Sequence, residues 1–246
     1  MRTFKADLHI HTVLSPCGDL EMSPSNIIRI AKSKQLDLIG ITDHNTTRQC
    51  AVIRELGQRE GIFVLCGVEV TTKEEAHCLA FFETTESLGA FQIYLDAHLP
   101  QVKNNPDLFG YQVAVDAEDN IVFEEERSLL SAIDQSIEKI EQQIHFLNGI
   151  FVPAHVNKGK NSVISQLGFI PNDLNIDALE LSKHISKEEF INKNKYLKNH
   201  VFIKSSDAHL PELIGETTSL FVMEALNFEE IKKALHNIDN RRVITA

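Results

Sequence analysis

The sequence has 246 residues, of which 43% are hydrophobic and 24% charged, a composition typical of a soluble globular domain with a large core. Its 24 Lys and Arg residues are outnumbered by 35 Asp and Glu residues, and the formal net charge of -11 argues against a long nucleic acid as partner. No apolar stretch approaches the roughly 20 residues of a membrane span. The first residues also lack the apolar core of a signal peptide.

Cysteine usage points to a reducing compartment. The four cysteines are Cys17, Cys50, Cys66 and Cys78, and they form no Cys-x-x-Cys pair. We therefore expect a cytoplasmic enzyme without disulfides.

Short apolar runs alternate with amphipathic stretches from the start of the chain, which is typical of β/α units. Strands are expected at 4–10, 37–42, 62–70 and 76–82, and helices at 24–35 and 46–60. Ser23 and Pro24 indicate where the first helix begins, because serine commonly caps a helix and proline fits its first turn.

The segment from about 83 to 127 interrupts this alternation with Pro100, Pro106 and an acidic run at 124–126, so we expect one insertion packed over a barrel mouth. Beyond it the apolar spacing predicts a helix over 128–147. Further strands are expected at 149–155, 178–182, 201–205 and 219–223. The pattern predicts a single α/β domain over residues 1–246.

Polar clusters follow most of the predicted strands. They are Asp7-Leu8-His9-Ile10-His11, Thr42-Asp43-His44-Asn45, Glu69, His77, His155 and Asp207-Ala208-His209. Parallel barrels gather their loops at the carboxyl ends of the strands. We therefore expect these distant residues to meet at the carboxyl ends of their strands.

The residue types in these clusters indicate a metal site. His9 and His11 point to the same side of a strand, and Asp207 and His209 repeat that arrangement. Glu69 is suited to bridge two ions. Imidazole and carboxylate ligands together favour Zn, Mn or Fe over magnesium or calcium. Paired ions of this kind convert a bound water to hydroxide and stabilise charge on a phosphoryl oxygen.

The motifs Asp7-Leu8-His9-Ile10-His11-Thr12, Thr42-Asp43-His44, Gly67-Val68-Glu69, Pro153-Ala154-His155 and Ser206-Asp207-Ala208-His209 occur in one order over nearly the whole chain. In these motifs and their order the sequence resembles the PHP (polymerase and histidinol phosphatase) family. The resemblance implies a distorted (β/α)7 TIM-like barrel with one insertion. It also implies a centre of two or three divalent metal ions that hydrolyses phosphoester bonds.

The resemblance assigns metal ligands to three groups. The first is His9, His11, Glu69 and Asp207; the second is Glu69, His77 and His155; the third contains His44 and His209. It also implies that Asp7 and Asp43 orient ligating imidazoles. The third group lacks its usual His or Asp after the His-x-His motif, and Cys17 and Asp19 are the two candidates to complete it. Cys17 is placed among the predicted metal ligands.

A phosphatase also needs cations for the oxygens that its metals leave unpaired. Arg127 at the end of the insertion, Lys158 after the strand that carries His155, and Lys183 are the candidates for contact with substrate. Each also fits a solvated surface cation.

The predicted function is hydrolysis of a small phosphorylated metabolite or nucleotide by a metal-activated hydroxide. Glu69, Asp207 and His209 are the predicted catalytic residues, and Asp207 or a ligating histidine assists proton transfer. Two alternatives stay open: a nuclease or nucleotide phosphodiesterase, and a regulatory module that binds metal without turnover.

Overall fold

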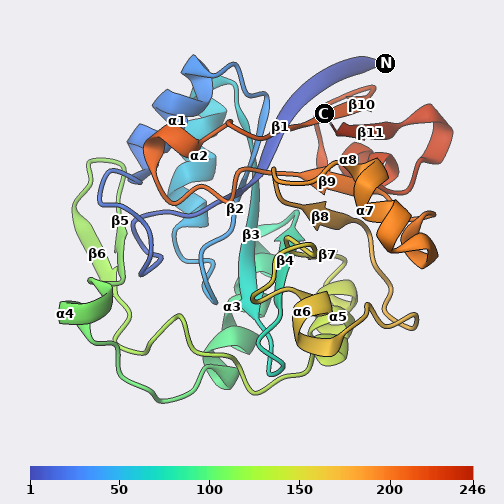
Figure 1. Cartoon of the computed structure of the whole chain (residues 1–246). Helices are drawn as coiled ribbons and strands as arrows, with labels where there is room; N and C mark the ends of the chain where they lie inside the picture. The colour runs from blue at the N-terminus through green and yellow to red at the C-terminus, as the bar shows by residue number, and fades with distance from the viewer. Residues whose placement is uncertain (246) are drawn as a thin grey trace.

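The computed structural model describes residues 1–245, which form a curled sheet surrounded by helices (Figure 1). The strands are β1 (Arg2–Ile10), β2 (Leu38–Ile41), β3 (Phe63–Thr71), β4 (His77–Phe82), β5 (Val113–Val115), β6 (Ile121–Glu124), β7 (Ile150–Pro153), β8 (Leu179–Leu181), β9 (Phe202–Lys204), β10 (Ser219–Met223) and β11 (Arg242–Thr245). The helices are α1 (Pro24–Ser33), α2 (Cys50–Glu60), α3 (Thr85–His98), α4 (Pro106–Phe109), α5 (Ile137–Phe146), α6 (Val163–Leu167), α7 (Lys187–Lys193) and α8 (Phe228–Leu235). Short 3-10 helices lie at Lys195–Leu197, Pro211–Leu213 and Ile238–Asn240.

The main sheet has the strand order β11-β10-β1-β2-β3-β4-β7, and the parallel pair β8–β9 lies between β7 and β1. Next to β7, the backbone N–H of Val156 donates to the carbonyl of Glu180 at 2.9 Å. Next to β1, the N–H of His11 donates to the carbonyl of Ala208 at 2.9 Å. These bonds join β8 and β9 to both sides, so the predicted distorted TIM-like barrel is confirmed.

Strand β4 departs from the β/α alternation. It pairs antiparallel with β3, and His77 lies opposite Thr71, because a tight turn joins the two strands without a helix. His77 therefore stands at the amino end of its strand, and the prediction of a carboxyl end was wrong for this residue. Since β4 runs in the opposite direction, its amino end lies at the same edge of the barrel as the carboxyl end of β3.

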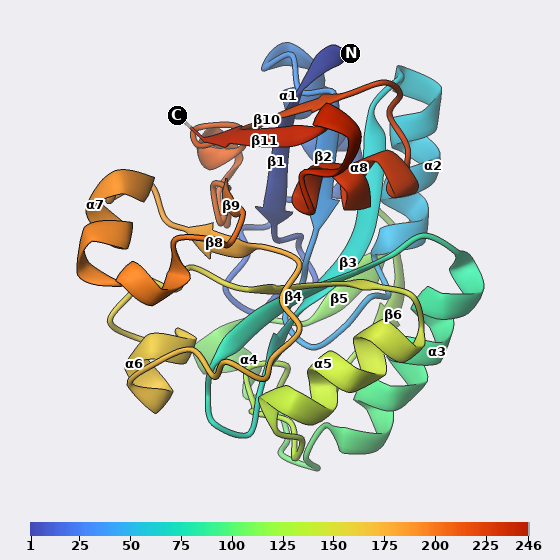
Figure 2. The same cartoon turned by 90° about the vertical axis from the view of Figure 1, so that its right-hand side faces the viewer.

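The helices cover the outside of the barrel. Figure 2 shows α2 and α3 on one side of the strands and α7 on the other. Helix α1 buries Ile27, Ile28 and Ala31 against this surface, and Leu8 and Phe81 are buried in a second apolar cluster. Burying each large apolar side chain contributes about 1.5–3 kcal/mol to the stability of the fold. The packed core therefore supports the strand ends.

The predicted insertion at 83–127 consists of helix α3 followed by α4 and the hairpin β5–β6. The side chain of Gln49 bonds both the N–H and the carbonyl of Val115, at 2.9 and 2.7 Å. Val113 and Val115 pack against Val13, so the hairpin covers the loop that follows β1.

The helix predicted over 128–147 begins only at Ile137. Asn45 explains the difference, because its side-chain amide donates to the carbonyls of Leu129 and Ser131 at 2.8 and 2.9 Å. These bonds hold the chain before α5 in an irregular path. Among residues 1–245 there is no helix with the length and apolar character that crossing a membrane requires.

Candidate metal centre

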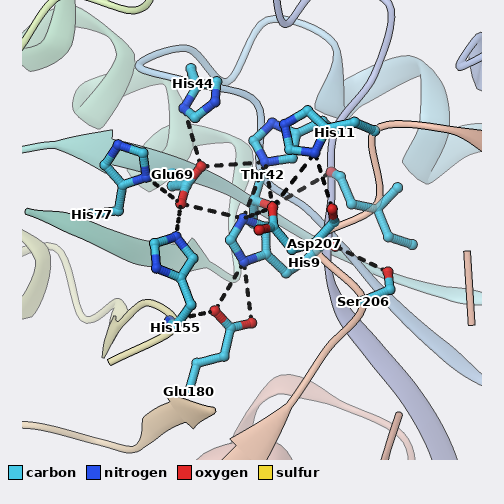
Figure 3. Close-up of polar contacts among 12 residues, drawn as sticks. His9, His11, Thr42, His44, Glu69, His77, His155, Glu180, Ser206 and Asp207 are labelled. Carbon is cyan, nitrogen blue, oxygen red and sulfur yellow. Dashed lines mark hydrogen bonds and ion pairs between the residues drawn. The ribbon is translucent and has the colours of Figure 1, made fainter. Parts of the chain in front are cut away.

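Buried histidines surround the carboxylate of Glu69 near the end of β3 (Figure 3). Its Oε1 lies 2.8 Å from His77 Nδ1 and 3.1 Å from His155 Nε2. Its Oε2 lies 3.1 Å from His44 Nδ1 and 3.3 Å from His11 Nε2. With His9 Nε2 3.5 Å from Oε1, each oxygen faces at least two imidazoles, which is the arrangement expected of a carboxylate that bridges two cations.

The first predicted ligand group is brought together around the end of β1. The Nε2 atoms of His9 and His11 lie 3.1 Å apart. Asp207 Oδ1 lies 3.4 Å from the first of these nitrogens and 3.5 Å from the second. Two imidazole nitrogens held this close, beside carboxylates, require a cation or a proton between them.

The third group gathers on the other side of His11. One ligand atom from each of His11, Cys17, His44 and His209 lies within 4.8 Å of all the others. The rings of His11 and His209 stack with centroids 4.0 Å apart. Asp19 does not belong to this group, since its Oδ1 accepts the N–H of Glu21. The geometry favours Cys17 of the two candidates.

Glu180, at the middle of β8, fixes the orientation of His9. Its carboxylate accepts from His9 Nδ1, with the two oxygens 3.1 and 3.0 Å away, and from the backbone N–H of His155 at 2.9 Å. His9 Nδ1 therefore carries the proton and Nε2 presents its lone pair to the centre. Sequence analysis did not assign this role to Glu180. The signal was a single acidic residue within the apolar run of a predicted strand.

Asp43 orients His11 through Ser15. The hydroxyl of Ser15 donates to Asp43 Oδ1 at 2.7 Å and lies 2.9 Å from His11 Nδ1. Because its one proton is committed to Asp43, the serine oxygen accepts from His11 Nδ1, and His11 Nε2 stays free for a metal. This arrangement agrees with the orienting role that the resemblance implies for Asp43.

Asp7 takes a different part from the one that the resemblance implies. It bonds no imidazole and accepts instead from the N–H and hydroxyl of Ser206, at 2.9 and 2.6 Å, and from the N–H of Gly215 at 2.8 Å. Burial raises the pKa of Asp7 to about 6. Asp7 thus holds the loop that carries Asp207.

The backbone turns sharply at two of the ligands. His155 has a φ of 28° and Asp207 a φ of 53°, in the left-handed region that most side chains avoid. Such a conformation costs on the order of 1 kcal/mol or more at each residue. His155 lies two residues after β7 and Asp207 three residues after β9, and the turn points their side chains into the shared centre.

The electrostatic field of the centre suits cation binding. Burial alone would raise the pKa of Glu69, but the imidazoles of His77, His9 and His44 hold it well below 4.5. Burial lowers the pKa of His209 to about 4 and places that of His44 well below 6.5. Burial also opposes protonation of His9, yet its carboxylate neighbours raise the pKa of that ring well above 6.5. The same negative field attracts a divalent cation.

Unpaired nitrogens test whether these residues fit metal ions. His155 Nδ1 and His44 Nδ1 are buried and make no hydrogen bond within residues 1–245, although His44 Nδ1 lies 3.1 Å from Glu69 Oε2. A buried polar atom without a partner costs about 1–3 kcal/mol, and a coordinated ion removes that cost. The donor set of imidazole, carboxylate and one thiol fits Zn, Mn or Fe.

A cavity of about 250 Å³ opens onto the centre. Its lining residues are His44, Glu69, His77, His155, Lys158, Lys160, Asn161, Asp207 and His209. The ammonium of Lys158 pairs with Asp207 Oδ2, which places this predicted substrate residue beside the metal ligands.

Arg127 lies on the insertion, and its guanidinium is already engaged. It bonds Glu125 at 2.9 Å and Asp96 at 3.0 Å, and it does not line the cavity of the metal centre. Its position gives no support to a substrate contact. Lys183 lines an adjoining cavity and pairs with Glu216 at 2.9 Å.

A model of the PHP domain family matches residues 7–239. The chain belongs to the PHP domain family. This family consists of metal-dependent hydrolases that include phosphoesterases and an endonuclease. The predicted family is confirmed, and metal-dependent hydrolysis is the general chemistry of its members.

Three known proteins illustrate the likeness. An uncharacterized protein of Methanocaldococcus jannaschii is 40% identical over 78 residues, which cover 28% of this chain and 46% of that protein. The structure of a lesion-specific endonuclease, endonuclease Q of Pyrococcus furiosus, matches with a TM-score of 0.76 at 21% identity and covers 98% of this chain and 58% of the other. The crystal structure of a putative metal-dependent phosphoesterase of Bifidobacterium adolescentis matches with a TM-score of 0.59 at 18% identity and covers 84% of this chain and 88% of the other.

The first two of these proteins are longer than this PHP domain, which matches about half of their length. Endonuclease Q has also been solved with a duplex that carries an abasic lesion. That duplex runs against the expectation that no long nucleic acid is a partner here. At 21% identity the likeness shows the fold alone, and the expectation stays a prediction.

Proposed function

We propose that this PHP domain hydrolyses the phosphoester bond of a small phosphorylated metabolite or nucleotide. One observation carries the proposal: the Glu69 carboxylate, 1% exposed, is surrounded by imidazoles at the base of a cavity that Lys158 and Lys160 also line. The cavity combines ligands for divalent cations with ammonium groups for phosphate oxygens. Both are needed to neutralise the charge of a reacting phosphate.

The chain supplies the positioning and proton chemistry. Divalent ions held by His9, His11, Glu69 and their neighbours would supply an activated water and neutralise charge on the phosphoryl group. Lys158, beside Asp207, stands where a non-bridging oxygen needs a donor. His209 donates its Nδ1 proton to the backbone carbonyl of Asp207, so His209 Nε2 bears a lone pair. That lone pair would hold an ion of the third group or, where no ion is held there, accept a proton.

The volume of the cavity and the net charge of the protein favour a small substrate. A cavity of about 250 Å³ is below the usual range for drug-sized ligands, which begins at ~300 Å³. The net charge of -11 repels the phosphates of a long duplex. Lys158 and Lys160 place positive charge at the cavity, and this local charge suits a single phosphate group.

The test compares the wild-type protein with Glu69→Gln on a phosphate monoester, a phosphodiester and a short oligonucleotide. Glu118→Gln is the matched control, because Glu118 is an exposed carboxylate on the insertion. We expect Mn²⁺- or Zn²⁺-dependent release of phosphate from the monoester by the wild type and the control, and loss of that release in Glu69→Gln. Robust turnover by Glu69→Gln would contradict the proposal.

A nuclease is the second candidate, and the match to endonuclease Q over 98% of this chain favours it. Faster cleavage of the oligonucleotide than of the monoester, lost in the same variant, would identify this activity. A protein that binds metal but hydrolyses none of the three compounds would instead be a regulatory module.

A further inference from the structure

A second cavity, of about 170 Å³, adjoins the metal centre. It shares His155, Lys158 and Asp207 with the cavity described above, so the two are neighbours across these three side chains. Its remaining lining residues are Glu180, Ser182, Lys183, His184, Ser205, Ser206 and Leu213. We call this cavity the side cavity. No step of phosphoester cleavage requires it.

The loops after β7 and β8 build one wall of the side cavity. Asn157 ties them together: its amide donates to Ser182 Oγ at 2.8 Å, and its carbonyl accepts the N–H of Ser182 at 2.8 Å. Ser182 Oγ therefore acts as an acceptor inside the protein, and its own proton remains to be donated. The side chain is buried, which fixes its position.

Ser205 adds an independent sign of a ligand. It is 4% exposed, and its hydroxyl oxygen has no hydrogen-bond partner within residues 1–245. Most buried hydroxyl groups are bonded, so an unpartnered one in the lining of a cavity indicates a missing acceptor or donor. Ser205 directly precedes the loop of Asp207, and it therefore lies next to the reacting centre.

The side cavity has two ammonium groups that can contact an anion, and they offset its two carboxylates. Lys158 and Lys183 are its cations. Glu180 is its one carboxylate besides Asp207, and both of its oxygens accept from His9. The ion pair of Lys183 with Glu216 is exposed, and such pairs contribute little, so the ammonium can turn to a ligand at small cost.

We propose that the side cavity binds a second anionic group of the substrate, a phosphate or a carboxylate, while the metal centre holds the phosphoester that is cleaved. This inference rests on the proposed function and names the class of substrate. Ser182 and Ser205 donate hydroxyl hydrogen bonds to the second anion, and Lys183 supplies the charge. A substrate with one phosphate and a neutral end leaves these donors unpaired.

The experiment uses three compounds with the metal-loaded protein: propyl phosphate, the same phosphate ending in a carboxylate, and the same phosphate ending in a second phosphate, each with short and long methylene linkers. The kcat/KM for phosphate release is measured for the wild type, Ser205→Ala and Lys183→Met. Lys193→Met is the matched control, because Lys193 forms an equivalent exposed pair with Glu189 at 2.9 Å.

We expect the wild type to have a higher kcat/KM for a doubly anionic compound than for propyl phosphate. The anionic end that gives the higher kcat/KM, carboxylate or phosphate, identifies the group that the side cavity binds. Ser205→Ala and Lys183→Met lower this preference about tenfold each, since each removes a donor to a charged group. Ser205→Ala also keeps or raises the melting temperature, because it removes a buried hydroxyl that lacks a partner. A structural role for Ser205 would lower the melting temperature instead.

Equal kcat/KM for the neutral and anionic ends in the wild type would overturn the inference, as would an unchanged preference in both variants. Failure of the proposed function looks different, because no compound would then release phosphate. In that case calorimetry with a non-hydrolysable bisphosphonate decides. Binding that Ser205→Ala and Lys183→Met weaken supports the side cavity as an anion site, and binding that both leave unchanged refutes it.

Discussion

Replacing Glu180 by glutamine removes a charge that touches no metal in the proposed centre. Its carboxylate lies 3.0 and 3.1 Å from His9 Nδ1 and accepts the N–H of His155 at 2.9 Å. Glutamine keeps the shape but loses the charge that favours the His9 tautomer with a free Nε2. Loss of such an outer carboxylate typically weakens metal affinity or activity about 10- to 100-fold, or about 1.4–2.8 kcal/mol.

The assay is a competition between the protein and a chelator of known Zn²⁺ affinity, followed by kcat/KM for a phosphate monoester. Glu230→Gln is the control, because Glu230 is also buried but bonds Arg241, at 3.0 and 3.1 Å. The control is expected to lose stability and to keep its metal affinity. Wild-type metal affinity and turnover in Glu180→Gln would refute the orientation of His9 by this carboxylate.

Two further predictions concern Cys17 and His145. The variant Cys17→Ser should bind one metal ion fewer per chain, counted by mass spectrometry. Loaded with Co²⁺, it should also lose the sulfur-to-metal absorption band of the wild type. An unchanged band would show that Cys17 is not a ligand. The hydrogen bond with Asp177 raises the pKa of His145 above 6.5, so its stabilisation is complete below that pH and is lost as the pH rises through the folded pKa. In urea unfolding, His145→Gln should therefore cost more free energy below pH 6.5 than in alkaline solution, and an equal cost at both would count against this.

Much of the barrel was predictable because its signals are local. Apolar runs bounded by polar residues marked the strands, and β10 has the predicted bounds at 219–223. The His-x-His spacing of His9 and His11 placed two imidazoles on one side of β1. Their convergence with Glu69 and Asp207 follows from the strand ends of a closed barrel.

The features that sequence analysis missed depend on contacts across the fold. Nothing near Glu180 in the sequence shows that His9 is its partner, since the two residues are far apart along the chain. The irregular path before α5 results from bonds with Asn45, which override the helical spacing of Leu129 and Ile133. Arg127 looked free in the sequence because its carboxylate partners are fixed only when the insertion folds.

The metal-removal experiment tests the central claim most directly. The protein is stripped with a chelator, phosphate release from a monoester is measured, and Mn²⁺ or Zn²⁺ is then restored while the bound ions are counted. The account predicts no release by the stripped protein and recovery that rises with the ions bound. Undiminished release by a metal-free protein would contradict it.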